Sequence, residues 1–216
     1  MAPKRSRQVV KLEPEGAELL EDYPQMVQRF RDAGWFEFLT TFQGYDEQVS
    51  MEFALNFNGH EVEIGKMLML VTEQKISKSC RLVVGGERWW KKEHVVTEFV
   101  NQFLLLDKKN TNWRRGVPHS WIRPEWHTAL IIIHRYISCE GRFSLVYIYH
   151  IRILMHLNGD YPLNLPYFLL KILTKMSKRV QSLSTNAKSG LFHQVLIKTL
   201  VMSSLREVQR PWSWLA

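Results

Sequence analysis

The 216-residue sequence has few cysteines and no apolar segment at its start. Cys80 and Cys139 are too few for a disulfide framework and lack the spacing of metal ligands, which favours a reducing, intracellular compartment. Met1–Arg7 is charged, and no hydrophobic stretch of a secretory signal follows it. Charged residues also interrupt the most apolar region before it reaches the roughly 20 residues that a membrane span needs. We therefore expect an intracellular protein without a membrane segment.

Catalytic signatures are scarce as well. The sequence has no glycine-rich phosphate loop, no nucleophile elbow and no histidine pair one helical turn apart with a carboxylate between. We therefore predict no catalytic residue, no cofactor and no metal site, and we lean towards a protein that is not an enzyme. A metal-dependent nuclease or transposase-like enzyme is the alternative, with His127, His134, His150 and Asp107 as its candidate residues. Isolated histidines on apolar helices are commonly hydrogen-bonded core residues, and Asp107 also fits a helix terminus.

The densest apolar sequence lies between Arg123 and Leu157. A break at 140–142 divides it into two segments that are apolar on nearly every side, which is typical of helices at the centre of a domain. Their β-branched and aromatic residues also fit strands, but their length favours helices. We expect two central helices that the rest of the chain covers.

Periodicity predicts further elements on both sides of this centre. We expect helices over 24–34, 47–57, 72–80, 95–104, 165–180 and 191–205. Alternation over residues 61–71, with Gly65 and Lys66 as a turn, predicts a small β-hairpin. The fold class is thus mainly α, a single globular domain with one hairpin. It spans 23–209, after a charged tail over 1–22 and before a C-terminal tail over 210–216.

Net charge is +8, and it is unevenly distributed. Residues 1–60 carry six Lys or Arg against ten Asp or Glu, whereas residues 61–216 carry 23 against 11. The basic part is expected to attract nucleic acid or an acidic protein, although a solvated surface would have the same composition. Lys4, Arg5 and Arg7 form a short basic cluster that fits a nuclear-import signal, so the nucleus is a candidate compartment.

Basic residues flank tryptophans in two predicted loops, and lysines line one face of a predicted helix. Such loops can hold a nucleic-acid backbone and stack a base, or the tryptophans can anchor the loop to the core while the charges stay hydrated. The lysines of the helix recur at i, i+4 and i+7, a row that can follow phosphates or can be a solvated face. The candidate binding residues are Arg88, Trp89, Trp90, Lys91, Lys92, Trp113, Arg114, Arg115, Lys171, Lys175 and Lys178.

Several linked motifs carry a family resemblance. They are GERWWKKE (86–93), NQFLL (101–105), VPHSW (117–121), RYISCEGRF (135–143), YHIRILMHLNGD (149–160), LNLPYFLLKILTKMSKRVQSL (163–183) and LFHQVLIKTLV (191–201). Together they resemble plant proteins found in or beside transposable elements, from about Lys11 to the C-terminus. The predicted hairpin followed by a short helix is more distantly similar to the plant mobile domain.

The resemblance implies a mainly helical module of plant mobile-element origin. It supplies no catalytic residues, and the three aligned carboxylates of a catalytic transposase are not evident in the sequence. Three functions therefore remain: a non-catalytic module that binds nucleic acid, the metal-dependent enzyme, and a protein–protein scaffold with no nucleic-acid role.

Overall fold

The computed structural model describes six ranges of the chain, namely 23–40, 46–89, 97–109, 116–139, 144–182 and 194–209. Both predicted tails lie outside these residues. Within them the chain is mainly helical, with one β-hairpin and one very short second strand pair. The mainly α fold class with a hairpin is thus confirmed.

The N-terminal part consists of short helices around the hairpin. Its elements are α2 (Pro24–Asp32), α3 (Phe36–Thr40), α4 (Glu47–Asn56), β1 (Glu61–Ile64), β2 (Met67–Leu70) and α5 (Glu73–Cys80). Side-chain caps fix where two of the helices begin: Asp46 accepts a hydrogen bond from the amide of Val49 (3.0 Å), and Thr72 accepts one from Lys75 (3.1 Å). The hairpin pairs Ile64 with Met67 across the predicted Gly65–Lys66 turn.

The apolar centre is helical, as predicted, but not uniformly so. A 3₁₀ turn (η3, Pro124–Trp126) leads into α7 (His127–Ile132), which continues as a π-helix (η4, Ile133–Ser138). The second helix, α8, spans Ile148–Leu157. Leu145 and Val146, which we expected in that helix, instead form strand β4 against β3 (Val117–Pro118). The β-branched and aromatic residues that also fitted a strand account for this correction.

The segment between the hairpin region and the centre is mostly irregular. It contains α6 (Thr97–Asn101), the 3₁₀ turns η1 (Leu106–Lys108) and η2 (His119–Trp121), and strand β3. The predicted helix over 95–104 is therefore observed only as α6 within the described residues. Leu104 and Ile122 form an isolated antiparallel bridge, so this segment folds back on itself instead of extending as a helix.

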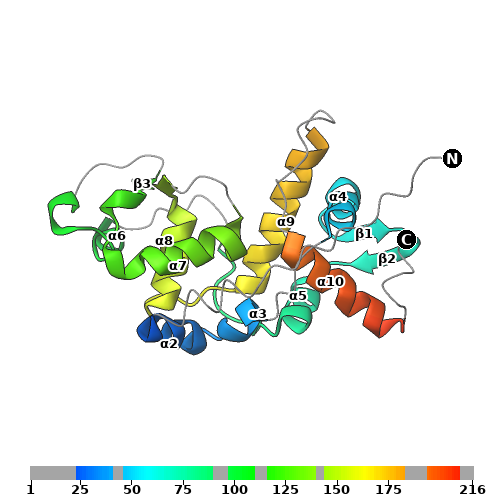
Figure 1. Cartoon of the computed structure of the whole chain (residues 1–216), viewed down its shortest axis with the longest axis horizontal. Coiled ribbons are helices and arrows are strands. Elements are labelled where there is room, and N and C mark those ends of the chain that lie inside the picture. Colours follow the sequence, from blue (N-terminus) through cyan, green and yellow to red (C-terminus); the bar gives the residue numbers. More distant parts are fainter. Residues whose placement is uncertain are drawn as a thin grey trace.

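Helix α9 (Leu165–Ser182) runs through the middle of the molecule, with α7 and α8 on one side and α4, α5 and α10 (Gln194–Glu207) on the other (Figure 1). It packs against α4, α5 and η4. Asn164 caps α9 by accepting a hydrogen bond from the amide of Tyr167 (2.9 Å), as the predicted helix start implied. The face of α9 that packs into the core is mainly apolar. Its buried apolar residues include Leu165, Phe168, Leu169, Ile172, Leu173, Met176 and Val180.

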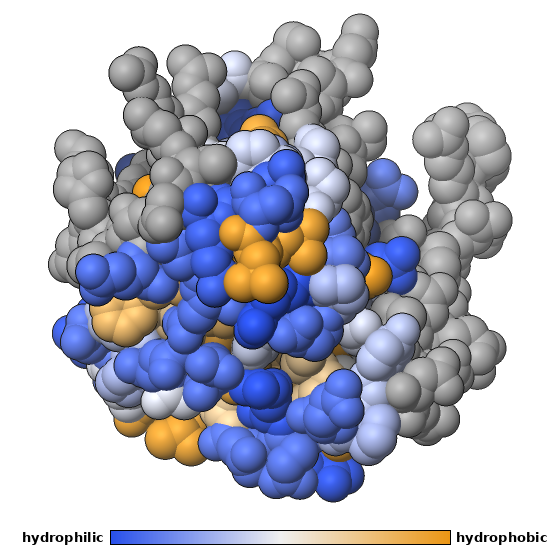
Figure 2. Space-filling view, turned by 90° about the vertical axis from the view of Figure 1, so that its left-hand side faces the viewer, coloured by the Kyte–Doolittle hydropathy of each residue, from blue (hydrophilic) through white to orange (hydrophobic). Residues whose placement is uncertain are grey.

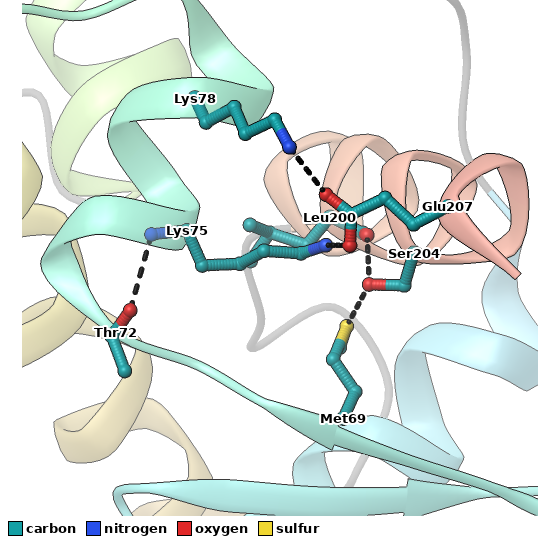
Figure 3. A network of polar contacts seen from close by, with 7 residues as sticks. All are labelled: Met69, Thr72, Lys75, Lys78, Leu200, Ser204 and Glu207. Atoms are coloured by element: carbon teal, nitrogen blue, oxygen red, sulfur yellow. Dashed lines mark hydrogen bonds and ion pairs between the residues drawn. The ribbon is translucent and has the colours of Figure 1, made fainter.

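Polar contacts fix α10 against α5 and the hairpin (Figure 3). The Glu207 carboxylate accepts hydrogen bonds from Lys75 (2.7 Å) and Lys78 (3.1 Å), and both cations lower its pKa through these bonds. The Ser204 hydroxyl lies 2.8 Å from the sulfur of Met69. Because Glu207 is 42% exposed, most of the docking energy comes from the buried leucines of α10 and little from this ion pair.

The segment Gly86–Trp89 pairs with the connection between α8 and α9. The amide of Glu87 donates to the carbonyl of Pro162 (2.8 Å), and the amide of Asn164 donates to the carbonyl of Glu87 (3.0 Å). Gly86, at φ +81°, lies so close that an added Cβ would be 2.8 Å from backbone carbons of Pro162 and Leu163. Both the conformation and the contact require glycine here.

We predict that Gly86→Ala lowers the free energy of unfolding by about 2–3 kcal/mol, because it combines a left-handed backbone with a backbone clash. Urea denaturation followed by tryptophan fluorescence measures the change. Gly85→Ala is the matched control, because a Cβ there would only approach Val83 at 3.9 Å. Equal urea midpoints for the two variants would contradict the close approach.

Candidate nucleic-acid interface

Two adjacent side chains of the segment 86–89 differ in exposure: Trp89 is buried, whereas Arg88 is on the surface. Trp89 is only 4% exposed, and the guanidinium of the buried Arg152 lies 5.1 Å from its ring centroid. Of the two interpretations of this loop, anchoring to the core therefore holds for Trp89, which does not present its ring to a base. Arg88 is the exposed neighbour, with 62% of its side chain accessible.

Two contacts hold Arg88 over the start of α9. Its Nε lies 3.3 Å from a carboxylate oxygen of Glu73, which also accepts a hydrogen bond from the side-chain amide of Asn164 (3.2 Å). Its guanidinium carbon lies 6.0 Å from the ring centroid of Tyr167. Arg88 is thus fixed next to the first turn of α9, although 79 positions separate it from Tyr167 in the sequence.

Helix α9 carries four cations and no acidic residue along its 18 positions. Lys171 and Lys175 are half-buried, whereas Lys178 and Arg179 are exposed. The ammonium group of Lys171 lies 5.0 Å from the ring centroid of Tyr167, and that of Lys175 lies 5.8 Å from the ring centroid of Tyr149 on α8. The predicted lysine row is therefore present on one helix, and tyrosine rings lie beside two of its members.

These contacts join the loop arginine and the helix lysines into one surface, which we call the basic strip. It consists of Arg88, Tyr149, Tyr167, Lys171, Lys175 and Lys178. Sequence reasoning found its cations but not its tyrosines. The spacing of Tyr167 four residues before Lys171 is a signal that would have indicated one pair. No sequence pattern indicates that Tyr149, on another helix, lies next to Lys175.

The other candidate residues cannot be placed on this surface. Trp90, Lys91, Lys92, Trp113, Arg114 and Arg115 lie outside the described residues. Near the second predicted loop, Lys108 lies 5.8 Å from the ring centroid of Trp121 and 2.8 Å from the carboxylate of Asp107. The binding role of these six residues therefore stays a prediction.

A view of one end of the molecule shows how its polar and apolar residues are distributed (Figure 2). Hydrophilic residues cover most of the described surface on this side, and the apolar residues form small separate patches among them. The largest exposed apolar side chains include Leu106 (83%) and Val83 (78%), which belong to different segments. The described surface in this view thus contains no broad apolar face of the kind that dominates obligate protein interfaces.

Histidines from the two central helices meet in the core beneath the strip. The rings of His134 and His150 lie 4.1 Å apart, and Nε2 of His150 lies 3.1 Å from the hydroxyl of Ser138. The amide of Tyr147 donates to Nδ1 of His150 (3.2 Å), so the ring proton is on Nε2 and is donated to Ser138. His150 cannot accept the proton of Ser138 in this arrangement, and the pair is not an activated serine nucleophile.

Of the residues of the metal-dependent alternative, His134 and His150 contact each other, whereas His127 and Asp107 make contacts with other residues. Nε2 of His127 lies 2.9 Å from the carbonyl oxygen of Ile122, and its ring lies 4.6 Å from that of His119. Asp107 pairs with Lys108, whose hydrogen bond lowers the pKa of that carboxyl. Among the residues that the structure describes, no three His, Cys, Asp or Glu side chains are grouped so that they could hold a metal ion.

Comparisons of the chain with protein-family models, with curated proteins and with solved structures find no match. None of the helices within the described ranges has the length and apolar character to cross a membrane.

Buried histidines make stability dependent on pH. Burial lowers the pKa of His150 well below its usual value, with a further contribution from His134 and then Lys175. Burial is also the main cause of the lowered pKa of His119 and His156. In the unfolded chain these groups take up protons near pH 6.5, whereas in the fold they do so only at lower pH.

We predict that these three histidines contribute fully to the free energy of unfolding above about pH 6.5. Their contribution is lost as the pH falls towards their pKa values in the folded state, because the unfolded state then binds more protons. Urea midpoints measured between about pH 7.5 and 5 test this, since most carboxylates titrate below that window. His150→Gln is expected to flatten the slope. A midpoint that stays constant or rises on acidification would rule the effect out.

Proposed function

We propose that this chain is a non-catalytic module of plant mobile-element origin that binds nucleic acid through the basic strip. The observation that supports binding is the meeting of Arg88 with the lysine row of α9, because it places cations from two distant segments on one surface. Phosphates supply most of the affinity of proteins that bind nucleic acid through such charges. The origin rests on the family resemblance of the linked motifs.

Regular spacing favours a nucleic acid over an acidic protein as the partner. Lys171 and Lys175 lie one turn apart, about 6 Å along the helix axis, and the row from Tyr167 to Lys178 extends for about 16 Å. A row of this kind suits the evenly repeated charges of a phosphodiester backbone. We further propose the nucleus as the site of action, from the basic cluster Lys4, Arg5 and Arg7.

A metal-dependent nuclease or transposase stays a sequence-based alternative, and no grouping among the described residues supports it. A protein scaffold without a nucleic-acid role is the outcome to expect if the chain fails to bind DNA and RNA at low salt.

We predict that Lys171→Gln/Lys175→Gln weakens binding of a DNA or RNA oligonucleotide and lowers the slope of log affinity against log salt by about 2, since each phosphate contact contributes about 1. Fluorescence anisotropy between about 50 and 200 mM salt measures both quantities. Glutamine keeps most of the lysine stem, so packing along α9 is retained.

Lys66→Gln/Arg206→Gln is the charge-matched control, because both cations are exposed and neither is part of the basic strip. This control is expected to keep the wild-type affinity to within about twofold, apart from its general effect on net charge. Equal losses in both variants would show that net charge alone governs binding. No binding by the wild type at about 50 mM salt would overturn the proposed function.

A further inference from the structure

The tyrosines of the basic strip are already in contact with cations. Tyr167 has Lys171 at 5.0 Å and Arg88 at 6.0 Å from its ring centroid, and Tyr149 has Lys175 at 5.8 Å. Distances up to about 6 Å are those of cation–π attraction. A base that stacked on either ring would have to compete with these cations for the ring face.

The other described aromatic rings near the basic strip also pack against protein side chains. Tyr147 stacks on Tyr149 with the ring centroids 5.5 Å apart and an interplanar angle of 12°, and the rings of Tyr149 and His150 meet edge to face with their centroids 4.2 Å apart. Trp89, one of the three tryptophans that the sequence offered for stacking, is in the core with Arg152 over it. The described aromatic rings of this region thus serve packing and the placement of charge.

The cations of the basic strip carry little information about base identity. An ammonium group is a point charge that donates in any direction, so Lys171, Lys175 and Lys178 suit phosphate oxygens without reading a base edge. The one arginine has its Nε directed at Glu73, which fixes the guanidinium against the protein surface. Contacts of this type position a backbone and do not discriminate sequence.

We infer that the basic strip recognises the phosphodiester backbone of a nucleic acid without stacking its bases, and that Tyr167 and Tyr149 are positioning residues that hold the cations in place. This inference rests on the proposed function, and it names the part of the nucleic acid that is bound. The tyrosines restrict the motion of the long lysine and arginine side chains, which reduces the entropy lost when a phosphate binds.

The first test compares a single-stranded oligodeoxynucleotide with an abasic strand of the same length and charge, by fluorescence anisotropy at about 50 mM salt. We expect the two dissociation constants to agree within about twofold. One stacked base would favour the ordinary strand by at least about fivefold. A preference of that size or larger would overturn the inference and leave the proposed function intact, whereas absence of binding to either strand would overturn both.

The second test uses Tyr167→Ala and Tyr167→Phe. The alanine variant is expected to weaken binding of both strands by the same factor, because it releases Lys171 and Arg88, and the phenylalanine variant is expected to restore it, because the ring face is kept. A loss confined to the ordinary strand would identify Tyr167 as a stacking residue and refute the positioning role. If Tyr167→Ala does not fold, the comparison of strands on the wild-type protein still decides.

Discussion

The backbone pairing of Glu87 with the Pro162–Asn164 connection is the constraint on which the surface depends. Two amide–carbonyl bonds hold a loop from the first half of the chain against the start of α9. Each bond contributes only about 1 kcal/mol, but together they set the register of the loop. In that register Trp89 enters the core, and Arg88 is left outside next to Tyr167. A shift by one residue would exchange the two side chains.

Buried polar groups at the centre of the molecule favour one particular packing of its helices and loops. Arg152 is 7% exposed, and its guanidinium carbon lies 5.1 Å from the ring centroid of Trp89 and 4.4 Å from that of Tyr161. Burying a cation is costly unless its surroundings compensate, and the rings supply part of that compensation. The same arginine therefore favours the arrangement in which Trp89 is inside. The π-helical stretch η4 places His134 and Ser138 beside His150, where hydrogen bonding fixes the orientation of α8.

Several of the described aromatic rings lie next to cations. Arg29 lies over Trp126 at 4.6 Å and Arg31 over Phe36 at 4.7 Å, in addition to the pairs of the basic strip. The sequence combines 12% aromatic residues with an excess of Lys and Arg over Asp and Glu, so both partners of such pairs are common in the chain. On α9 the result is a row of cations whose side chains are partly fixed before any partner arrives. This preorganisation links the core packing to the proposed binding of phosphates.

Much of the fold could be predicted from the sequence. The helix starts at Asp46, Thr72 and Asn164 depend on local hydrogen bonds, and the hairpin depends on alternation around Gly65–Lys66, so neighbouring residues suffice to specify them. The predictions that were wrong lie where a distant partner intervenes: Leu145 and Val146 become a strand because Val117 and Pro118 pair with them. Likewise, composition alone left two interpretations of Trp89, and burial decided between them.

For the candidate site, the sequence by itself determined which cations exist and that three lysines of α9 share one face, because helical periodicity is a local property. Only the tertiary structure decided that Arg88 joins them, that Tyr149 and Tyr167 lie beside them, and that Trp89 does not. These relations depend on contacts between segments up to 79 positions apart, and periodicity within a segment contains no information about them.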